Sequence, residues 1–281
     1  MSTLHLVATP IGNLEDISAR ALRVLREVGL IAAEDTRHTA RLLQHYGILT
    51  PCLSYHEHNK LVRLERVLAA LDAGDVALVS DAGTPALNDP GYELVRAALA
   101  AGHAVSPVPG ACAPVAALVA SGLPTDTFLY LGYLPRRPVE RQRLLQNIAV
   151  LPYTLIFLET PHRLKDGLAD LAAVLGDRQV AVGRELTKLH EEIFRGSLSQ
   201  ASAHFTSQPP RGEFTLVVAG YTAQAVRWSE EDLRAALLPA HSLPEKPAAL
   251  ARRLAAESGW SKNDVYELLR RLREEQSDEP G

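Results

Sequence analysis

Five short polar segments, each placed directly after an apolar run, hold most of the side chains that could do chemistry. Their carboxylate, hydroxyl, imidazole, amine and guanidinium groups can move protons or contact phosphates. The carboxyl ends of parallel strands face a ligand crevice, and the segments come from both halves of the chain. They therefore predict a ligand site in a cleft between two domains. The segments are residues 9–10, 34–37, 81–85, 159–163 and 183–188.

Segment 81–85 is the one around which the others are arranged. It follows an apolar run, 76–79, that reads as a buried parallel strand. Ala82 and Gly83 carry little or no side chain, so a ligand could approach the backbone closely. Asp89 is expected to cap the helix that follows, and Pro90 to be its first residue. An ordinary loop between a strand and a helix would have a similar composition.

Several common ligand-binding motifs are absent from the sequence. The turn at 9–13 lacks the Gly-x-Gly-x-x-Gly of Rossmann dinucleotide sites. The chain contains neither the Gly-x-x-x-x-Gly-Lys-Ser/Thr phosphate loop nor the Gly-x-Ser-x-Gly nucleophile elbow. His56 and His58 would share a strand face, but no further ligand is near them, so no metal site is predicted. Cys52 and Cys112 are far apart and indicate no disulfide scaffold.

The composition is that of a globular protein with enough apolar material for two cores. The 281 residues are 47% hydrophobic and 22% charged, with a formal net charge of -4, and this length favours about two domains. A mildly acidic chain has no overall field for nucleic acid, so RNA binding would depend on local basic patches. No apolar run approaches the ~18 residues of a membrane span, and the chain enters a strand without a leader. We therefore expect a cytoplasmic protein with no membrane partner.

The order of predicted elements indicates an α/β fold. Strands and helices alternate up to about residue 112, which favours a mostly parallel sheet covered by helices. The pattern changes at 121–126, and longer apolar strands follow, with a strand at 191–196 that could pair antiparallel with a neighbour. We predict an N-terminal α/β domain, a mixed α/β domain and a helical tail, at residues 1–122, 123–222 and 223–281.

The tail has helix-forming composition without strands. Three short helices are expected near 231–238, 247–258 and 262–275, and 258–264 reads as a tight turn with an N-cap, as in a helix-turn-helix. The tail is locally basic, and a solvated helical face explains its arginines about as well as RNA contact does. These arginines are Arg252, Arg253, Arg270, Arg271 and Arg273.

Five phrases of the sequence, which include the polar segments apart from Gly183, resemble one family. In order, the phrases occupy residues 7–17, 33–37, 80–85, 159–163 and 184–188. A single phrase would be weak, but the ordered set is similar to the bacterial ribosomal RNA small subunit methyltransferase I family, within the tetrapyrrole methylase superfamily. The resemblance runs from about residue 4 to 220.

The resemblance implies two α/β domains of tetrapyrrole-methylase type, with S-adenosylmethionine folded in the cleft between them. It also implies a homodimer and methyl transfer to the ribose 2′-hydroxyl of a cytidine, near the decoding centre of 16S rRNA or the small ribosomal subunit. The positions that would contact the methyl donor, by resemblance, are Asp81, Ala82, Gly83, Thr84, Pro85, Gly110, Ala111 and Leu158.

A ribose hydroxyl is a poor nucleophile near neutral pH, so a nearby base or cation should assist it. The polar segments leave several candidates open, including Glu34, Asp35 and Glu185. Glu34 or Asp35 could instead start a helix. We predict catalytic roles for Glu159, His162 and Lys188, although His162 could equally cap a helix.

Arginine side chains suit phosphate oxygens because their planar donors match them. We predict RNA contacts at Arg37, Arg136, Arg137, Arg163 and Arg184, with Arg141 as a further candidate. Exposed arginines without a ligand are equally ordinary.

Two rival functions remain at this stage. One is a tetrapyrrole methylase of the same superfamily that acts on a corrin-ring precursor. The other is a non-catalytic RNA-binding factor in ribosome assembly that keeps an old cofactor fold. The basic residues at 136–137 favour RNA over a small tetrapyrrole, and the 81–85 loop favours a working cofactor site.

Overall fold

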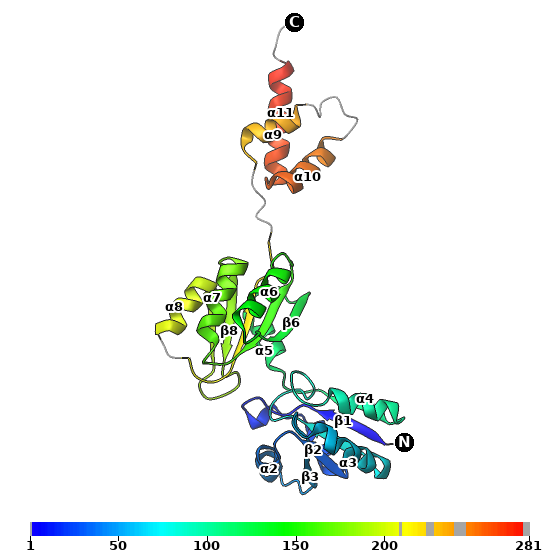
Figure 1. The fold of residues 1–281 in the computed structure, drawn as a ribbon. Helices are drawn as coiled ribbons and strands as arrows, with labels where there is room; N and C mark the ends of the chain where they lie inside the picture. The colour runs from blue at the N-terminus through cyan, green and yellow to red at the C-terminus, as the bar shows by residue number, and fades with distance from the viewer. Residues whose placement is uncertain (1, 208–209, 223–227, 239–245, 278–281) are drawn as a thin grey trace. The chain divides into compact units, whose positions relative to one another are not determined.

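The fold consists of two β-sheets, each covered by helices, and a helical tail, as the sequence predicts. A computed structural model describes residues 2–207, 210–222, 228–238 and 246–277. They form two compact units, residues 1–221 and 222–281. The first unit holds two five-stranded sheets, and in the second the described residues form helices (Figure 1). No helix within the described ranges is long and apolar enough to span a bilayer.

The first sheet is entirely parallel, so all its strands end at one edge. Its strand order is β3-β2-β4-β1-β5. The central strand β4 is fully buried, which agrees with its continuous apolar run. Segments 9–10, 34–37 and 81–85 therefore leave the sheet at the same edge. The strands are β1 (Thr3–Val7), β2 (Leu30–Ala33), β3 (Cys52–Ser54), β4 (Val76–Val79) and β5 (Ala104–Val108).

Helices cover both faces of the first sheet (Figure 1). The apolar side chains of α1 and α2 pack on one face, and those of α3 and α4 pack on the other. The Asp35 carboxylate accepts a hydrogen bond from the Arg37 backbone at 2.8 Å and so caps α2. The bounds are η1 (Leu14–Asp16), α1 (Ala19–Glu27), α2 (Thr36–His45), α3 (Lys60–Ala73) and α4 (Tyr92–Ala100).

The predicted start of α4 is wrong. The helix begins at Tyr92, and its N-cap is Gly91 rather than Asp89. Gly91 has φ 149°, a conformation that favours glycine, and an added Cβ would lie 2.7 Å from Leu78. The chain therefore turns at Gly91, and Asp89 and Pro90 remain in the loop.

The second sheet is mixed, with strand order β6-β7-β10-β8-β9. Strand β6 is parallel to β7, whereas β10 is antiparallel to both of its neighbours. The predicted antiparallel strand near 191–196 is confirmed as β9, paired with β8. The strands are β6 (Phe128–Tyr133), β7 (Thr154–Glu159), β8 (Gln179–Arg184), β9 (Glu192–Ser197) and β10 (Phe214–Val218).

Among the described residues, four helices pack on the second sheet. One face of this sheet forms a single core with three helices, α6 (Pro138–Ile148), α7 (Leu164–Leu175) and α8 (Leu198–Ser207). Helix α5 (Ala113–Ser121) packs on the opposite face, although it follows the last strand of the first sheet. The sequence did not predict α5, α8 or the three-residue strand β3.

The second unit has a core of its own, made by α9 (Glu230–Leu237), α10 (Pro247–Ser258) and α11 (Lys262–Ser277). The predicted turn and N-cap are confirmed, because Ser261 Oγ accepts a hydrogen bond from the Asp264 backbone at 3.1 Å. The predicted tail residues 223–227, 239–245 and 278–281, and the side chain of Arg273, lie outside the description.

Candidate functional site

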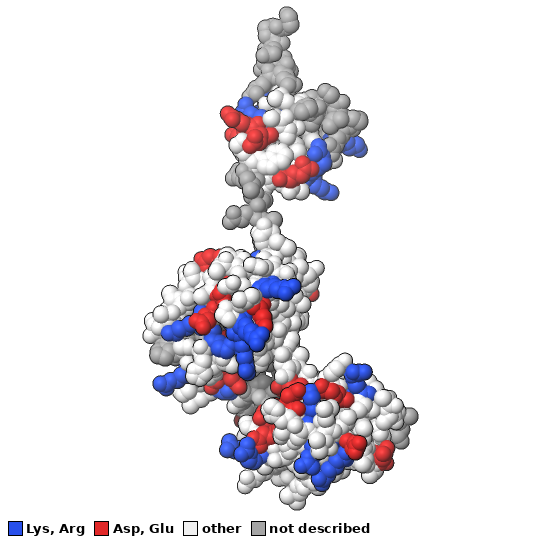
Figure 2. Space-filling model, viewed as in Figure 1, with Lys and Arg blue, Asp and Glu red and all other residues white. Residues whose placement is uncertain are grey.

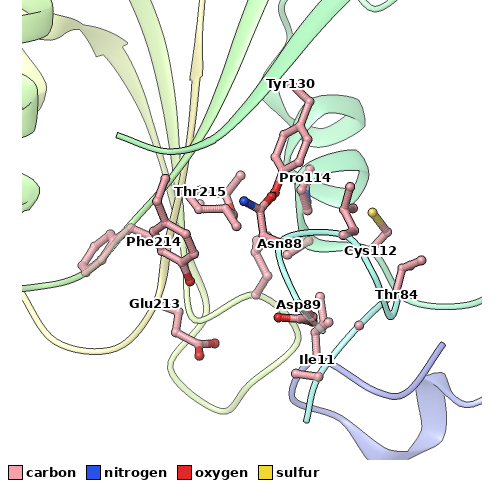
Figure 3. Close-up of a pocket in the computed structure, with 18 of the residues that line it drawn as sticks. Ile11, Thr84, Asn88, Asp89, Cys112, Pro114, Tyr130, Glu213, Phe214 and Thr215 are labelled. Atoms are coloured by element: carbon pink, nitrogen blue, oxygen red, sulfur yellow. The ribbon is translucent and has the colours of Figure 1, made fainter. Parts of the chain in front are cut away.

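A cavity of about 230 Å³ is lined by residues of both sheets (Figure 3). One wall comes from the segments that follow β1, β2 and β4, together with the start of α5. The other wall comes from β6, from the carboxyl ends of β7 and β8, and from the amino end of β10. These ends coincide because β10 is antiparallel to β7 and β8, with Phe214 opposite both Glu159 and Arg184. The cavity is thus a meeting point of strand ends from two sheets.

The loop after β4 is held in place by the ends of β1 and β5. Thr9 and Gly83 exchange two backbone hydrogen bonds, of 2.9 and 3.0 Å. Gly83 has φ 78°, and an added Cβ would lie 3.3 Å from Ile11 Cγ2. The Thr84 hydroxyl donates to the Ala111 carbonyl at 3.3 Å. This loop therefore presents its backbone to the cavity without a side chain at Gly83.

The far end of the same loop contacts β6. Asn88 has φ 65°, and its Oδ1 accepts a hydrogen bond of 2.7 Å from the Tyr130 hydroxyl (Figure 3). Gly132 has φ 65°, and an added Cβ would lie 2.5 Å from Asn88 Nδ2. The unusual backbone of Asn88 is thus supported by contacts from the second sheet.

Carboxylates give the cavity an acidic wall, made by Glu34, Asp81, Asp89 and Glu213. Asp81 Oδ1 accepts from the Asp35 backbone at 3.0 Å, and the Asp81 backbone donates to Glu34 Oε2 at 3.3 Å. Burial, and next the nearby charge of Glu34, raise the pKa of Asp89 to about 6. Burial also raises the pKa of Glu34. This arrangement favours a cationic ligand.

The structure brings together five of the eight predicted donor-contacting residues, which are Asp81, Ala82, Gly83, Thr84 and Leu158. The other three do not line the cavity. Pro85 is buried. Ala111 holds Thr84 through its carbonyl. An added Cβ at Gly110 would lie 3.0 Å from Ala8 Cβ.

Glu159 borders the cavity, but its carboxylate is packed beside α7. The side chain is 0% exposed, and Oε2 would lie 3.5 Å from a Cβ added at Gly167 of that helix. Oε1 accepts from the Thr160 backbone at 2.8 Å, and Oε2 lies 3.4 Å from Arg163 Nη2 and accepts no hydrogen bond from the described residues. Burial raises the pKa of this carboxyl.

The other two predicted catalytic residues lie outside the cavity lining. His162 is exposed and does not cap α7, whose N-cap position is Arg163. Lys188 is bound to Glu185 at 2.9 Å and to Glu213, a cavity residue, at 3.1 Å. The ammonium of Lys188 therefore reaches the cavity only through Glu213.

Four of the five predicted RNA-binding arginines are engaged with the protein, and Arg137 is one of them, because it pairs with Glu140 at 3.1 Å. Arg37 pairs with Asp35 at 2.7 Å, although its side chain is 89% exposed. Arg184 pairs with Glu192 at 3.1 Å, and Arg163 donates to the carbonyls of Leu134 and Pro135.

Arg136 and Arg137 are exposed on the loop between β6 and α6. The further candidate, Arg141, is only 5% exposed and pairs with Asp170, so it cannot meet RNA. In the view of Figure 2, basic and acidic side chains intermingle without a continuous basic face.

The sequence did not predict Asn88, Tyr130 or Glu213 as site residues. Tyr130 lies inside an apolar strand, so nothing local marks it. Glu213 precedes β10, which runs antiparallel to β7 and β8, so it does not belong to the polar residues that follow strands in the sequence. Among the residues described, no group of three or more His, Cys, Asp or Glu side chains is suited to hold a metal ion.

Comparison with known proteins identifies the family. Residues 3–202 match the family described as Tetrapyrrole (Corrin/Porphyrin) Methylases. Ribosomal RNA small subunit methyltransferase I of Synechocystis sp. is 50% identical over 273 residues, covering 95% of this chain and 97% of that protein. The protein of that name from Pseudomonas aeruginosa is 50% identical over 274 residues, covering 94% and 95%.

A solved structure shares the fold. Uroporphyrin-III C-methyl transferase from Thermus thermophilus, complexed with S-adenyl homocysteine, has a TM-score of 0.54 at 20% identity, and the match covers 77% of this chain and 97% of that one. The predicted tetrapyrrole-methylase fold is therefore confirmed. The chain belongs to the ribosomal RNA small subunit methyltransferase I family, within the tetrapyrrole methylases.

Proposed function

We propose that this protein transfers a methyl group from S-adenosylmethionine to small-subunit ribosomal RNA, at the ribose 2′-hydroxyl of a cytidine. The observation that carries the proposal is the acidic cavity built on the 81–91 loop, in a chain half identical to the small-subunit RNA methyltransferases. We further propose that the protein acts in the cytoplasm as a homodimer, with residues 1–122 and 123–222 as the two domains that enclose the cofactor.

The cavity residues fit this cofactor. Gly83 leaves its backbone open to close approach, and the carboxylates suit a cation. When bound, the cofactor supplies an electrophilic methyl group on a positively charged sulfur. In the proposal, Asp81, Ala82, Gly83 and Thr84 hold it from the first sheet, and Leu158 from the second.

Several of the remaining predicted residues receive supporting or RNA-binding roles. Ala111 supports the loop, because its carbonyl accepts the Thr84 hydrogen bond, Pro85 is a buried residue of the loop itself, and Gly110 allows close packing on Ala8. Lys188 holds Glu213 in the cavity wall, because its ammonium pairs with that carboxylate at 3.1 Å. Arg136 and Arg137 are the arginines best placed for RNA phosphates, because both are exposed on a loop that Arg163 and Arg141 fix. An RNA phosphate would compete with Glu140 for Arg137, which pairs with that carboxylate at 3.1 Å.

The proposal is tested by transfer of labelled methyl from S-adenosylmethionine to small ribosomal subunits that lack the modification. We expect the label to appear as 2′-O-methylcytidine after nuclease digestion. Label in a base, or none at all, would contradict the assignment. Uroporphyrinogen III serves as the rival acceptor; its carboxylate side chains would be repelled by the acidic cavity wall, so we expect no transfer to it.

Binding of S-adenosylmethionine should weaken below about pH 6. The pKa of Asp89 is about 6 in the folded protein, and only the ionised form attracts a cation. At pH 5 about a tenth of such a group is ionised, so we expect up to about a tenfold rise in Kd from pH 7 to pH 5. Calorimetry of wild type and Asp89→Asn across this range is the measurement; the variant should bind more weakly at pH 7 and show a flatter profile. An unchanged pH dependence in Asp89→Asn would contradict the assignment.

The raised pKa of Asp89 affects folding stability in the opposite direction to cofactor binding. Because the folded pKa of Asp89 lies above its usual value of 3.8, the folded state binds the proton more tightly. The contribution of Asp89 to stability is therefore greatest at low pH and falls as pH rises from about 4 to about 6.

Replacing Tyr130 by phenylalanine should weaken cofactor binding about fivefold. The change removes the 2.7 Å hydrogen bond that holds Asn88, and one such bond contributes about 1 kcal/mol. Tyr153→Phe is the matched control, because Tyr153 is 41% exposed and does not line the cavity. Equal Kd values for the two variants would show that Tyr130 does not position the loop.

A further inference from the structure

A second cavity, of about 250 Å³, lies on the other side of Asp81. It is formed by the end of β1, η1, the first turns of α2 and the end of β4. Pro10, Leu14 and Leu42 give it aliphatic walls, and Thr39, which is 3% exposed, adds a buried hydroxyl-bearing side chain. Asp81 lines both this cavity and the cofactor cavity.

The Asp81 carboxylate is held at one oxygen. Oδ1 accepts the 3.0 Å hydrogen bond from the Asp35 backbone, at the start of α2. Oδ2 accepts no hydrogen bond from the residues that the structure describes. The carboxylate is thus oriented by α2 and keeps one oxygen for a ligand hydroxyl at the boundary of the two cavities.

We propose that the second cavity binds one unstacked pyrimidine nucleoside of the RNA, with its ribose hydroxyl at Asp81. This inference rests on the proposed function and identifies where the acceptor is held. Base-specific recognition of RNA generally uses nucleotides whose bases are splayed out of a stack, and an enzyme that modifies one nucleotide benefits from isolating it.

The chemistry of the cavity favours this occupant. Pro10 and the two leucines can pack against a flat base. Arg41 and His38 are exposed at the same cavity, and an arginine fork suits the adjoining phosphate.

The position of Asp81 also provides an acceptor for the proton that the ribose hydroxyl loses during methyl transfer. The hydroxyl oxygen forms the new bond to the methyl carbon while the carbon–sulfur bond breaks and its electron pair stays on sulfur. The hydroxyl proton passes to Asp81 Oδ2 and from there to water. The sulfur becomes neutral, so charge and atoms balance without another reactant.

The test fills the cavity and leaves the cofactor site intact. Leu14 is 40% exposed, and Leu14→Trp places a larger side chain at the cavity; Leu49→Trp is the control, since Leu49 is 95% exposed and lines neither cavity. Arg41→Ala is the second variant, with the exposed Arg66 of α3 replaced by alanine as its control.

Two measurements are made on each full-length variant, namely the Kd of S-adenosylmethionine by calorimetry and the kcat and KM for methyl transfer to small subunits. We expect Leu14→Trp to bind the cofactor within about twofold of wild type and to lose about 10–100-fold in kcat/KM, because the hydroxyl is displaced from the methyl group. Arg41→Ala should raise KM for the subunit about fivefold or more at unchanged cofactor affinity. Both controls should behave as wild type.

Three results would overturn the inference. One is a kcat/KM of Leu14→Trp equal to that of Leu49→Trp. Another is a parallel loss of cofactor affinity, which would assign the cavity to the cofactor. If Leu14→Trp does not fold, as judged by its thermal transition, Arg41→Ala decides, and an unchanged KM contradicts the inference. Failure of the proposed function is distinguishable, because wild type itself would then transfer no methyl group.

Discussion

Replacing Gly83 by valine is expected to raise the Kd for S-adenosylmethionine by about 100-fold or more. The residue has φ 78°, and its Cβ position lies 3.3 Å from Ile11 and 3.7 Å from the Ala111 carbonyl. A β-branched side chain disfavours this backbone by about 1–3 kcal/mol, which lowers the fraction of loops able to bind. The valine also projects where the cofactor would approach, and a combined loss near 3 kcal/mol corresponds to about 100-fold. Calorimetry measures it.

Gly102→Val separates the loss of the cofactor site from backbone strain alone. Gly102 has φ 82°, close to that of Gly83, but nothing lies within 4 Å of its Cβ position. It lies between α4 and β5 and lines neither cavity. Both variants should lose similar stability in thermal unfolding, and only Gly83→Val should lose binding. If both bind normally, the cofactor does not approach this loop.

Replacing Arg141 by methionine is expected to lower the free energy of unfolding by about 3–5 kcal/mol. The Arg141 side chain is 6% exposed, and it lies 2.5 Å from the Asp170 carboxylate at its closest contact. It also donates to the Pro135 carbonyl at 3.2 Å. Methionine would leave the half-buried Asp170 charge without its cation. Urea unfolding, with the midpoint and slope both fitted, measures the change.

The double variant Arg141→Met with Asp170→Leu provides the control. Replacing both members of a buried pair by apolar residues is often neutral, because two desolvated charges are removed together. The double variant should therefore be more stable than Arg141→Met alone. If it is less stable by the sum of the two single changes, the pair is not coupled. The exposed pair Arg23 and Glu27 offers a comparison, and Arg23→Met should change stability by less than about 1 kcal/mol.

Local patterns predicted most of the first sheet and its loop. Short apolar runs bounded by polar residues predict β2 and β4 correctly. Asp35 caps α2, which is one of the two roles that the sequence left open for it. The small residues of the 81–85 loop and its resemblance to a family predict a ligand site there, and the structure places four of its five residues, all except Pro85, in the cavity lining. The start of α4 was misjudged because the Asp89-Pro90 pair is a good cap by type, whereas the conformation of Gly91 decides where the chain turns.

Long-range pairing determined what the sequence could not predict. The Arg141 and Asp170 side chains are 29 positions apart, and nothing near Arg141 marks it as buried. Glu159 follows Leu155 and Phe157 on the α7 face of β7, so its carboxylate turns from the cavity although its backbone borders it. The alternation of side chains along a strand predicts that residues 155, 157 and 159 share one face of β7. Only the packing of the helices shows that the cavity adjoins the other face.

The placement of α5 has a consequence for synthesis of the chain. This helix packs on Ile156, Ala181 and Val217 of the second sheet, and Val217 is made 96 positions after Ser121, the last residue of α5. At about 5–20 residues per second, the ribosome needs roughly 5–20 s to supply the last of these partners. During that interval the first sheet can form while the apolar face of α5 is uncovered. We therefore expect the nascent chain to recruit a chaperone at this stage, and a fragment ending at residue 122 to aggregate unless α5 is removed.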